Sequence, residues 1–301
     1  ADWSPMDTRT ENLINPIVDY TRYEQNSIND AYGIEHAFQV DYYNPITSSH
    51  FIETGAKYTL RQNFSNTTIF KMDEDSGEWQ EDNTRVNDLD YNQHIGSIYG
   101  GYTYRYRKLT LKGGFRAEFT LNDGLSKSSS GDVTFTNKQF DIVPYLNFSY
   151  MESGGHILSL SYTQRLNRPG IYYLNPYVND SNPMSISYGN PDLKSVKRDA
   201  LSFSYMKASL SWNLGITLSA DFTRNNIENI RRVGVSGVST STYENIGKNQ
   251  NYTLNLNYSY RAGSKINLYL NGSIVYTIIS SQELNLRNSG FGYSGGFGAN
   301  L

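Results

Sequence analysis

The side chains that could contact a ligand are concentrated in one segment of the chain, residues 165–193. Arginine, asparagine, proline and glycine recur there, in a long loop between two regular segments, where a β-scaffold usually carries function. The same residue types also shape loops, because proline fixes φ, glycine permits positive φ and asparagine caps turns. We favour the structural role and keep ligand contact as the alternative. The residues concerned are Arg165, Arg168, Pro169, Leu174, Asn175, Pro176, Gly189, Asn190, Pro191 and Leu193.

A second candidate feature is a group of charged residues on one predicted strand. Lys112, Arg116 and Glu118 alternate with apolar residues in segment 108–122, so their side chains share one face of that strand. They could line the path of a solute through a lumen. Charge on an inward face is also ordinary in a hydrated lumen, so the pattern does not decide between the two.

Metal binding and catalysis receive little support from the residue spacing. Calcium takes about six to eight oxygens, but the acidic segment lacks EF-hand spacing, so we interpret it as a solvated loop. The histidines are scattered without metal-ligand or triad spacing, and the absence of cysteine excludes thiolate sites and disulfides. We predict a non-enzyme without a cofactor or metal. The acidic residues are Asp73, Glu74, Asp75, Glu78, Glu81 and Asp82, and the histidines are His36, His50, His94 and His156.

The composition indicates a polar β-wall with many aromatic residues. Hydrophobic residues make up 38% of the 301 residues, below the roughly 45–50% of a typical globular domain, while aromatics reach 14% with 26 tyrosines. A transmembrane β-barrel with aromatic girdles and a polar lumen is expected to have this kind of composition. The net charge of −3 and the lack of a basic stripe argue against a nucleic-acid partner. There is no apolar run long enough for a transmembrane helix.

Alternation of apolar and polar residues runs through most of the chain and predicts strands. In segment 156–167, Leu158, Leu160 and Tyr162 oppose serines and a threonine, as expected for a strand with two unlike faces. Residues 1–33 show no clean pattern, and Pro5 and Pro16 argue against a central strand, so we expect an irregular segment there. The predicted strands cover 34–45, 50–64, 91–106, 108–122, 138–151, 156–167, 197–207, 209–233, 239–260, 265–281 and 288–301.

The length and order of these segments predict a membrane barrel. Most sustain alternation for 10 residues or more, whereas soluble strands average about 5–6 and membrane-spanning strands need about 9–11. Short and long connections alternate, so we predict an all-β fold, an antiparallel up-and-down meander that forms part of a large transmembrane β-barrel. The odd number of segments, and a last segment that is still alternating at Leu301, indicate a portion of a larger barrel. Tyr99, Tyr102, Tyr104 and Tyr106 are predicted to form an interfacial girdle.

An ordered set of motifs resembles a known family. They are Arg-Leu-Asn-Arg-Pro (165–169), Leu-Asn-Pro (174–176) and Gly-Asn-Pro-Asp-Leu (189–193), preceded by DYYNPI with FIETGAKYTLRQ (41–62) and by the segment 89–120. In this order they resemble the outer-membrane β-barrel family of Bacteroidetes related to TonB-dependent receptors. The resemblance covers about residues 38 to 301.

This resemblance implies a function in transport. The parent protein would take up a nutrient or chelate across the outer membrane, binding it at loops 65–90, 123–137, 168–196 and 281–288. Its partners would be outer-membrane lipid, a plug domain, the remaining barrel strands, TonB and an unknown small ligand. Neither the plug nor the TonB-contacting segment is visible in this sequence. The alternatives are a passive structural or adhesive barrel, and a soluble carbohydrate-binding β-module in which exposed tyrosines stack on sugars.

Overall fold

The computed structural model describes residues 25–73, 76–83, 87–128, 131–182, 184–263 and 266–300. Within these ranges, eleven long strands follow one another in chain order as an antiparallel meander, which confirms the predicted fold class. The one described helix has four residues, and no helix in these ranges could cross a membrane. The long strands are β1 (Gln25–Pro45), β2 (His50–Met72), β4 (Asn87–Tyr106), β5 (Leu109–Ser128), β6 (Val133–Glu152), β7 (His156–Asn167), β10 (Val196–Ala208), β11 (Trp212–Val233), β12 (Ser239–Ala262), β13 (Ile266–Ser281) and β14 (Leu286–Asn300).

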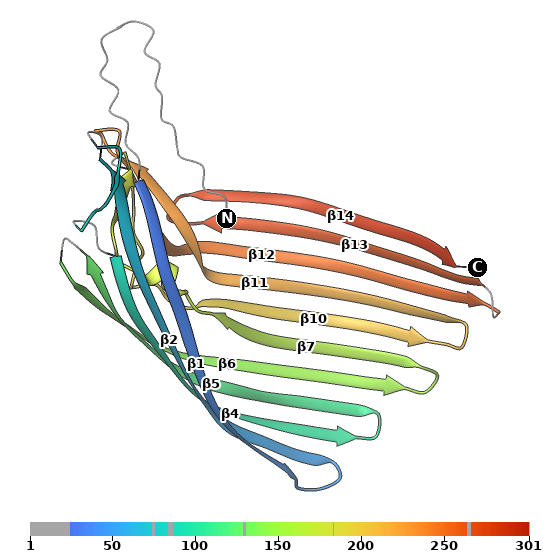
Figure 1. The fold of residues 1–301 in the computed structure, drawn as a ribbon. Helices are drawn as coiled ribbons and strands as arrows, with labels where there is room; N and C mark the ends of the chain where they lie inside the picture. The colour runs from blue at the N-terminus through green and yellow to red at the C-terminus, as the bar shows by residue number, and fades with distance from the viewer. Residues whose placement is uncertain are drawn as a thin grey trace, which may run out of the picture.

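The strands form one curved sheet with unlike ends (Figure 1). Tight turns such as that between Tyr106 and Leu109 gather at one end, and the longer connections gather at the other. The connection between β7 and β10 lies in the hollow of the curve and carries α1 (Ile171–Leu174), β8 (Asn179–Asn182) and β9 (Ser185–Ser187). A further short strand, β3 (Trp79–Glu81), pairs with the end of β2.

Several strands are longer than the sequence pattern predicted. β1 begins at Gln25, where it pairs with Lys71, so residues 25–33 are strand and not part of an irregular segment; residues 1–24 lie outside the described ranges. Much of the predicted loops 65–90 and 123–137 likewise belongs to β2, β4, β5 and β6. These extensions lie at the end of the sheet where the longer connections gather. Backbone pairing continues there, but the apolar-outward alternation ends because outward positions such as Asp88 and Asp90 of β4 are polar.

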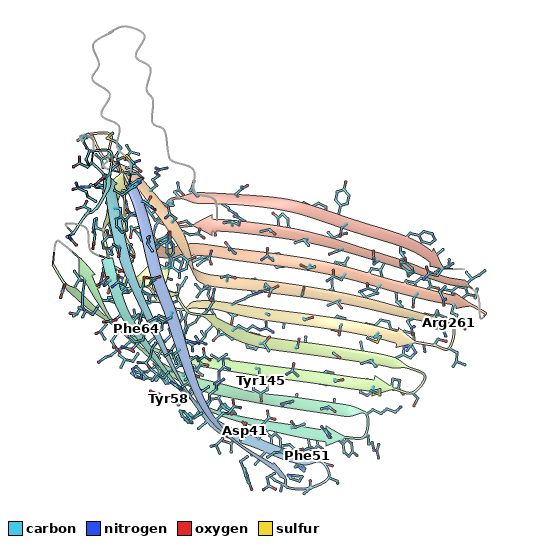
Figure 2. All side chains as sticks on the ribbon, in the orientation of Figure 1. Asp41, Phe51, Tyr58, Phe64, Tyr145 and Arg261 are labelled. Atoms are coloured by element: carbon cyan, nitrogen blue, oxygen red, sulfur yellow. The ribbon has the colours of Figure 1, made fainter. Side chains whose placement is uncertain are left out.

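The outer face of the sheet is covered with exposed apolar side chains. Phe38 is 70% exposed, Val40 74% and Ile98 63%, and the same face continues to Phe291 and Phe297 on β14. Neighbouring residues on these strands face inward and are mostly polar, such as Asp41 and Tyr145, which are labelled in Figure 2. Contiguous apolar surface of this extent is unfavourable in water, and contact with lipid removes that cost. The outer face is therefore the membrane-facing side of the wall.

Tyrosines near the tight turns divide between the two faces. Tyr102, Tyr104 and Tyr106 point outward, and the rings of Tyr102 and Tyr104 lie 5.9 and 4.9 Å from that of His50. Tyr99 differs, because odd-numbered residues of β4 point inward, and its hydroxyl donates to Asp41. The prediction that Tyr99 belongs to an outer girdle is therefore wrong, since its parity along the strand places it on the inner face.

The two faces predict unequal responses to a new charge on β7. In the full-length protein refolded into phospholipid vesicles, Leu160→Arg should lower the free energy of unfolding by about 2 kcal/mol, because the guanidinium would enter the hydrocarbon. Ser161→Arg, one residue along and facing inward, is the matched control and should change it much less. Urea titration followed by tryptophan fluorescence measures both. Equal losses would contradict the assignment of the outer face to lipid.

Candidate functional site

The connection between β7 and β10, residues 168–195, folds back against the inner face of the sheet, and we call it the strap. Its β9 pairs in parallel with β12, from Ser185↔Ser239 to Ser187↔Ser241. On the other side, the ladder between β6 and β7 ends at Tyr145↔Thr163, and beyond it inward side chains of β6 hydrogen-bond the strap backbone. The strap is thus bonded to the wall at both of its sides.

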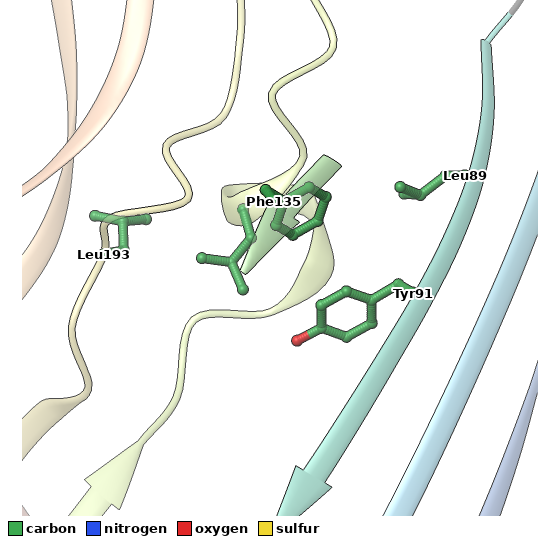
Figure 3. Packing of buried hydrophobic residues seen from close by; sticks show 5 residues of the cluster. Leu89, Tyr91, Phe135 and Leu193 are labelled. Carbon is green, nitrogen blue, oxygen red and sulfur yellow. The ribbon is translucent and has the colours of Figure 1, made fainter. Parts of the chain in front are cut away.

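A small hydrophobic cluster fixes the middle of the strap. Leu174 is 0% exposed and Leu193 1%, and they pack with Leu89 and Tyr91 of β4 and Phe135 of β6 (Figure 3). Burial of a leucine side chain contributes about 1.5–3 kcal/mol, so these two anchors stabilise a short segment substantially. Both predicted motif leucines therefore act in packing.

Gly189 lies where two parts of the strap backbone approach closely. Its amide donates to the carbonyl of Asn175 (2.9 Å), and the amide of Asn190 donates to the carbonyl of Tyr173 (2.6 Å). A Cβ at position 189 would lie 2.4 Å from the Asn175 carbonyl oxygen and 2.7 Å from that of Tyr173. Only glycine fits between these backbone atoms.

The motif asparagines bind backbone groups. Asn175 Oδ1 accepts from the amide of Tyr177 (3.0 Å), and Asn190 Oδ1 accepts from the amide of Asp192 (2.9 Å). Asn190 Nδ2 also donates to the carbonyl of Tyr243 on β12 (2.9 Å). These contacts place the asparagine side chains in turns and in the attachment of the strap to the wall.

The prolines complete the turns of the strap. Pro169 is fully buried at its start, and Pro176 follows the end of α1. The carbonyl of Pro191 accepts from Asn137 Nδ2 on β6 (2.8 Å), which also donates to the carbonyl of Leu193 (3.1 Å). These contacts tie residues 191–193 of the strap to β6.

Two amides on β6 hold the strap, and the sequence did not single them out. Besides Asn137, Gln139 Oε1 accepts from the amide of Ser195 (2.8 Å), and Gln139 Nε2 donates to the carbonyl of Leu193 (3.1 Å). The available signal was a pair of amide side chains at successive inward positions of one strand. Such a pair can replace the ladder that a neighbouring strand would supply.

A buried ion pair fixes the start of the strap. The guanidinium of Arg168 contacts the carboxylate of Glu118 on β5, which also pairs with Arg116, and Arg168 Nε donates to Thr120 Oγ1 (3.0 Å). The side chain of Glu118 is 6% exposed and that of Arg168 18%. Burial lowers the pKa of Arg168 to about 10, and the neighbouring Arg116 and Arg61 act in the same direction, so Arg168 stays protonated at neutral pH. Arg165 is exposed and does not join this pair.

Between the strap and the tight-turn end of the sheet, the inner face of the wall carries an open hollow of about 790 Å³, which we call the basic hollow. Lys112, Arg116 and Glu118 all line it, so the three predicted lumen-facing residues lie on one surface. Lys112 pairs with Glu53 (2.8 Å), which accepts from the Tyr145 hydroxyl (2.7 Å). The described lining residues carry six cationic and two anionic side chains. An excess of fixed positive charge in a recess attracts anionic groups.

A second hollow, of about 610 Å³, lies between the strap and residues 29–33 of β1 and 63–67 of β2, at the end of the sheet with the longer connections. Tyr172 of α1 and Tyr243 of β12 contribute to its lining. The strap therefore separates two recesses of unlike chemistry, one cationic and one rich in tyrosine and asparagine.

Comparison with known proteins identifies the family. The sequence profile of the outer membrane protein beta-barrel family matches residues 4–301. The chain belongs to this family. It is an outer-membrane β-barrel chain, and the soluble carbohydrate-binding module is set aside. None of the curated protein sequences compared with this barrel chain matches it.

Solved structures share the fold of this barrel chain at low sequence identity. The copper transporter OprC has a TM-score of 0.60 at 13% identity, over 90% of this chain and 42% of its own. The ferric citrate transporter FecA has 0.58 at 12%, over 92% and 41%. The ferric yersiniabactin uptake receptor FyuA from Yersinia pestis has 0.52 at 13%, over 91% and 40%. This barrel chain thus spans about two fifths of the length of each of these proteins.

The remaining polar groups of the barrel chain form separate local contacts. In the acidic segment, Asp73 Oδ1 accepts from the amide of Ser76 (2.8 Å), and Asp82 pairs with Lys71 (2.6 Å); Glu74 and Asp75 lie outside the described ranges. Within those ranges no three histidine or acidic side chains gather as metal ligands would. His50, His94 and His156 each contact a tyrosine hydroxyl, on different strands.

Proposed function

We propose that the protein containing this chain is a non-catalytic receptor that takes up a small nutrient or chelate across the outer membrane. The observation that carries the proposal is the strap, which is fixed over the inner face by packing, backbone bonds and a buried ion pair. A passive or adhesive barrel needs loops that face outward. A loop held rigidly over the lumen, with recesses on both sides, instead suits selection of a solute that passes through.

The orientation follows from the ends of the sheet. Outer-membrane barrels have short periplasmic turns and longer extracellular loops, so the strap and the tyrosine-lined hollow lie on the extracellular side of the basic hollow. A solute from outside meets the strap first and the cationic wall second. In this proposal the motif residues of the strap act mainly by fixing its shape, while Lys112, Arg116 and Glu118 line the path.

The proposal extends to the partners of the whole protein. The fold is shared with proteins named as a copper transporter and a ferric citrate transporter, which supports transport as the activity. A plug domain would fill the lumen against the polar inner face, and TonB would supply the energy for moving it. Outer-membrane lipid covers the apolar outer face.

The test compares strains with and without the full-length protein, each in backgrounds with and without TonB. Mass spectrometry follows the depletion of small molecules from a complex medium over short times. We expect at least one compound to be depleted faster when both the protein and TonB are present. Identical depletion profiles with and without the protein would refute uptake. A difference that persists without TonB would instead indicate a passive barrel.

A further inference from the structure

The hollow between the strap and β1 and β2 has the size of a ligand site, and we call it the tyrosine pocket. Its volume of about 610 Å³ falls within the roughly 300–1,000 Å³ of small-molecule pockets. α1 forms one side, with Ile171 and Tyr172 in the lining, and Asn63 and Ser65 of β2 contribute to the other.

Three tyrosines that belong to or adjoin the pocket are held in fixed positions. Tyr172 and Tyr173 of α1 and Tyr243 of β12 meet edge to face, with ring centroids 4.9–5.8 Å apart. The Tyr243 hydroxyl donates to that of Tyr172 (3.1 Å). α1 itself is anchored by the fully buried Leu174. Tyr172 is nevertheless 72% exposed, so a preorganised ring surface faces the pocket side of the strap.

The lining chemistry favours a neutral ligand with both polar and apolar surface. No described lining residue carries a charge, in contrast to the basic hollow on the other side of the strap, so the pocket offers no ion pair to an anionic chelate. The apolar part of the lining comes largely from tyrosine rings, with Phe64, Leu89 and Ile171 beside them, so the pocket offers aromatic faces more than aliphatic surface. The remaining side chains are mostly hydroxyls and amides, which both donate and accept hydrogen bonds.

We propose that the tyrosine pocket binds a neutral, hydroxyl-rich ligand of the oligosaccharide class; this rests on the proposed uptake function and specifies its substrate. A sugar presents hydroxyls around its edge and C–H groups on its face. The amides and hydroxyls of the pocket match the edge, and the exposed ring of Tyr172 matches the face, because aromatic side chains combine apolar area with a polar tip. Neutral ligands would thus be selected before they reach the cationic wall.

The experiment measures binding to the purified full-length protein by isothermal titration calorimetry in a detergent without sugar groups. The probes are four neutral oligosaccharides (maltohexaose, cellohexaose, xylohexaose and mannohexaose), ferric citrate as the anionic chelate, and tetra-alanine as a peptide. We expect saturable binding of at least one oligosaccharide. Tyr172→Ala should weaken it about tenfold or more, whereas Tyr172→Phe should retain it within about threefold.

Tyr42→Ala is the matched control, since Tyr42 is 56% exposed on the outer face near a tight turn, and it should leave binding unchanged. The inference fails if no oligosaccharide binds, if only ferric citrate or tetra-alanine binds, or if Tyr172→Ala retains full affinity. The depletion test separates this failure from that of the proposed function. TonB-dependent depletion of a charged compound would refute the pocket's ligand class and leave uptake intact, whereas oligosaccharide binding without depletion would refute uptake alone.

Discussion

Gly189→Ala in the full-length protein is expected to detach the strap from the wall without unfolding the barrel. The added methyl group would meet the carbonyl oxygens of Asn175 and Tyr173 at 2.4 and 2.7 Å, and backbone atoms cannot rotate away as a side chain would. The two backbone hydrogen bonds around Gly189 and Asn190 would be lost as well. Strap opening here means local detachment of residues 168–195 from the wall while the barrel stays folded. The overpacking and the lost bonds together should lower the free energy of this opening by about 3–4 kcal/mol.

Hydrogen exchange of the strap amides measures this opening directly, because local openings have their own free energies below that of global unfolding. Gly170→Ala is the matched control, since a Cβ at position 170 would meet no atom within 4 Å. Exchange should quicken throughout residues 171–193 in the first variant and stay unchanged in the second. Equal protection in both would show that the close approach at Gly189 does not hold the strap.

Arg168→Met is expected to lower the free energy of strap opening by about 3 kcal/mol. Methionine keeps much of the aliphatic length of arginine but removes the charge that compensates the buried carboxylate of Glu118. Breaking a buried pair in this way costs about 3–5 kcal/mol, and the lower end applies because Arg116 still contacts Glu118. The same exchange experiment, read at the amides near Pro169 and Ile171, measures the loss.

Two further variants separate the ion pair from a general effect of charge. Arg165→Met removes an exposed motif arginine three residues away and should leave exchange nearly unchanged. Combining Arg168→Met with Glu118→Gln should cost less than the two single changes added together, because each single change leaves the other partner buried without compensation. Strict additivity would mean that Arg168 acts through packing and not through its charge.

The strands were predictable where two different solvents impose alternation. Residues such as Phe38 and Val40 must face lipid while their neighbours face a polar lumen, so sequence alone reveals the strand there. Beyond the membrane the outward positions are mostly polar and the apolar-outward pattern is lost, so β1 from Gln25 and β2 up to Met72 have the sequence pattern of a loop. Tyr99 was misplaced for another reason. It lies near a strand end like the girdle tyrosines, but its odd position on β4 places its side chain on the inner face.

The candidate site was predictable in its residue types but not in its contacts. Proline, glycine and asparagine marked the strap as a shaped loop, and alternation placed Lys112, Arg116 and Glu118 on one face. The partners that hold the strap are distant in sequence: Asn137 lies 56 residues from Leu193, and Arg168 lies 48 residues from Thr120. Periodicity within a strand carries no information about such pairs. The tyrosine pocket was missed for the same reason, because α1 and β12 meet only in the folded chain.

The attachment of the strap to β6 through side chains also has a consequence for the order in which the wall forms. The hairpins on either side close through tight turns, so their ladders can extend residue by residue from neighbouring ends. Beside Asn137 and Gln139 no such route exists, since the ladder stops next to Pro144, which has no amide hydrogen, and the new partners arrive from far along the chain. Long-range closure is slow. We therefore expect the strap to dock on β6 after the hairpins on either side have formed.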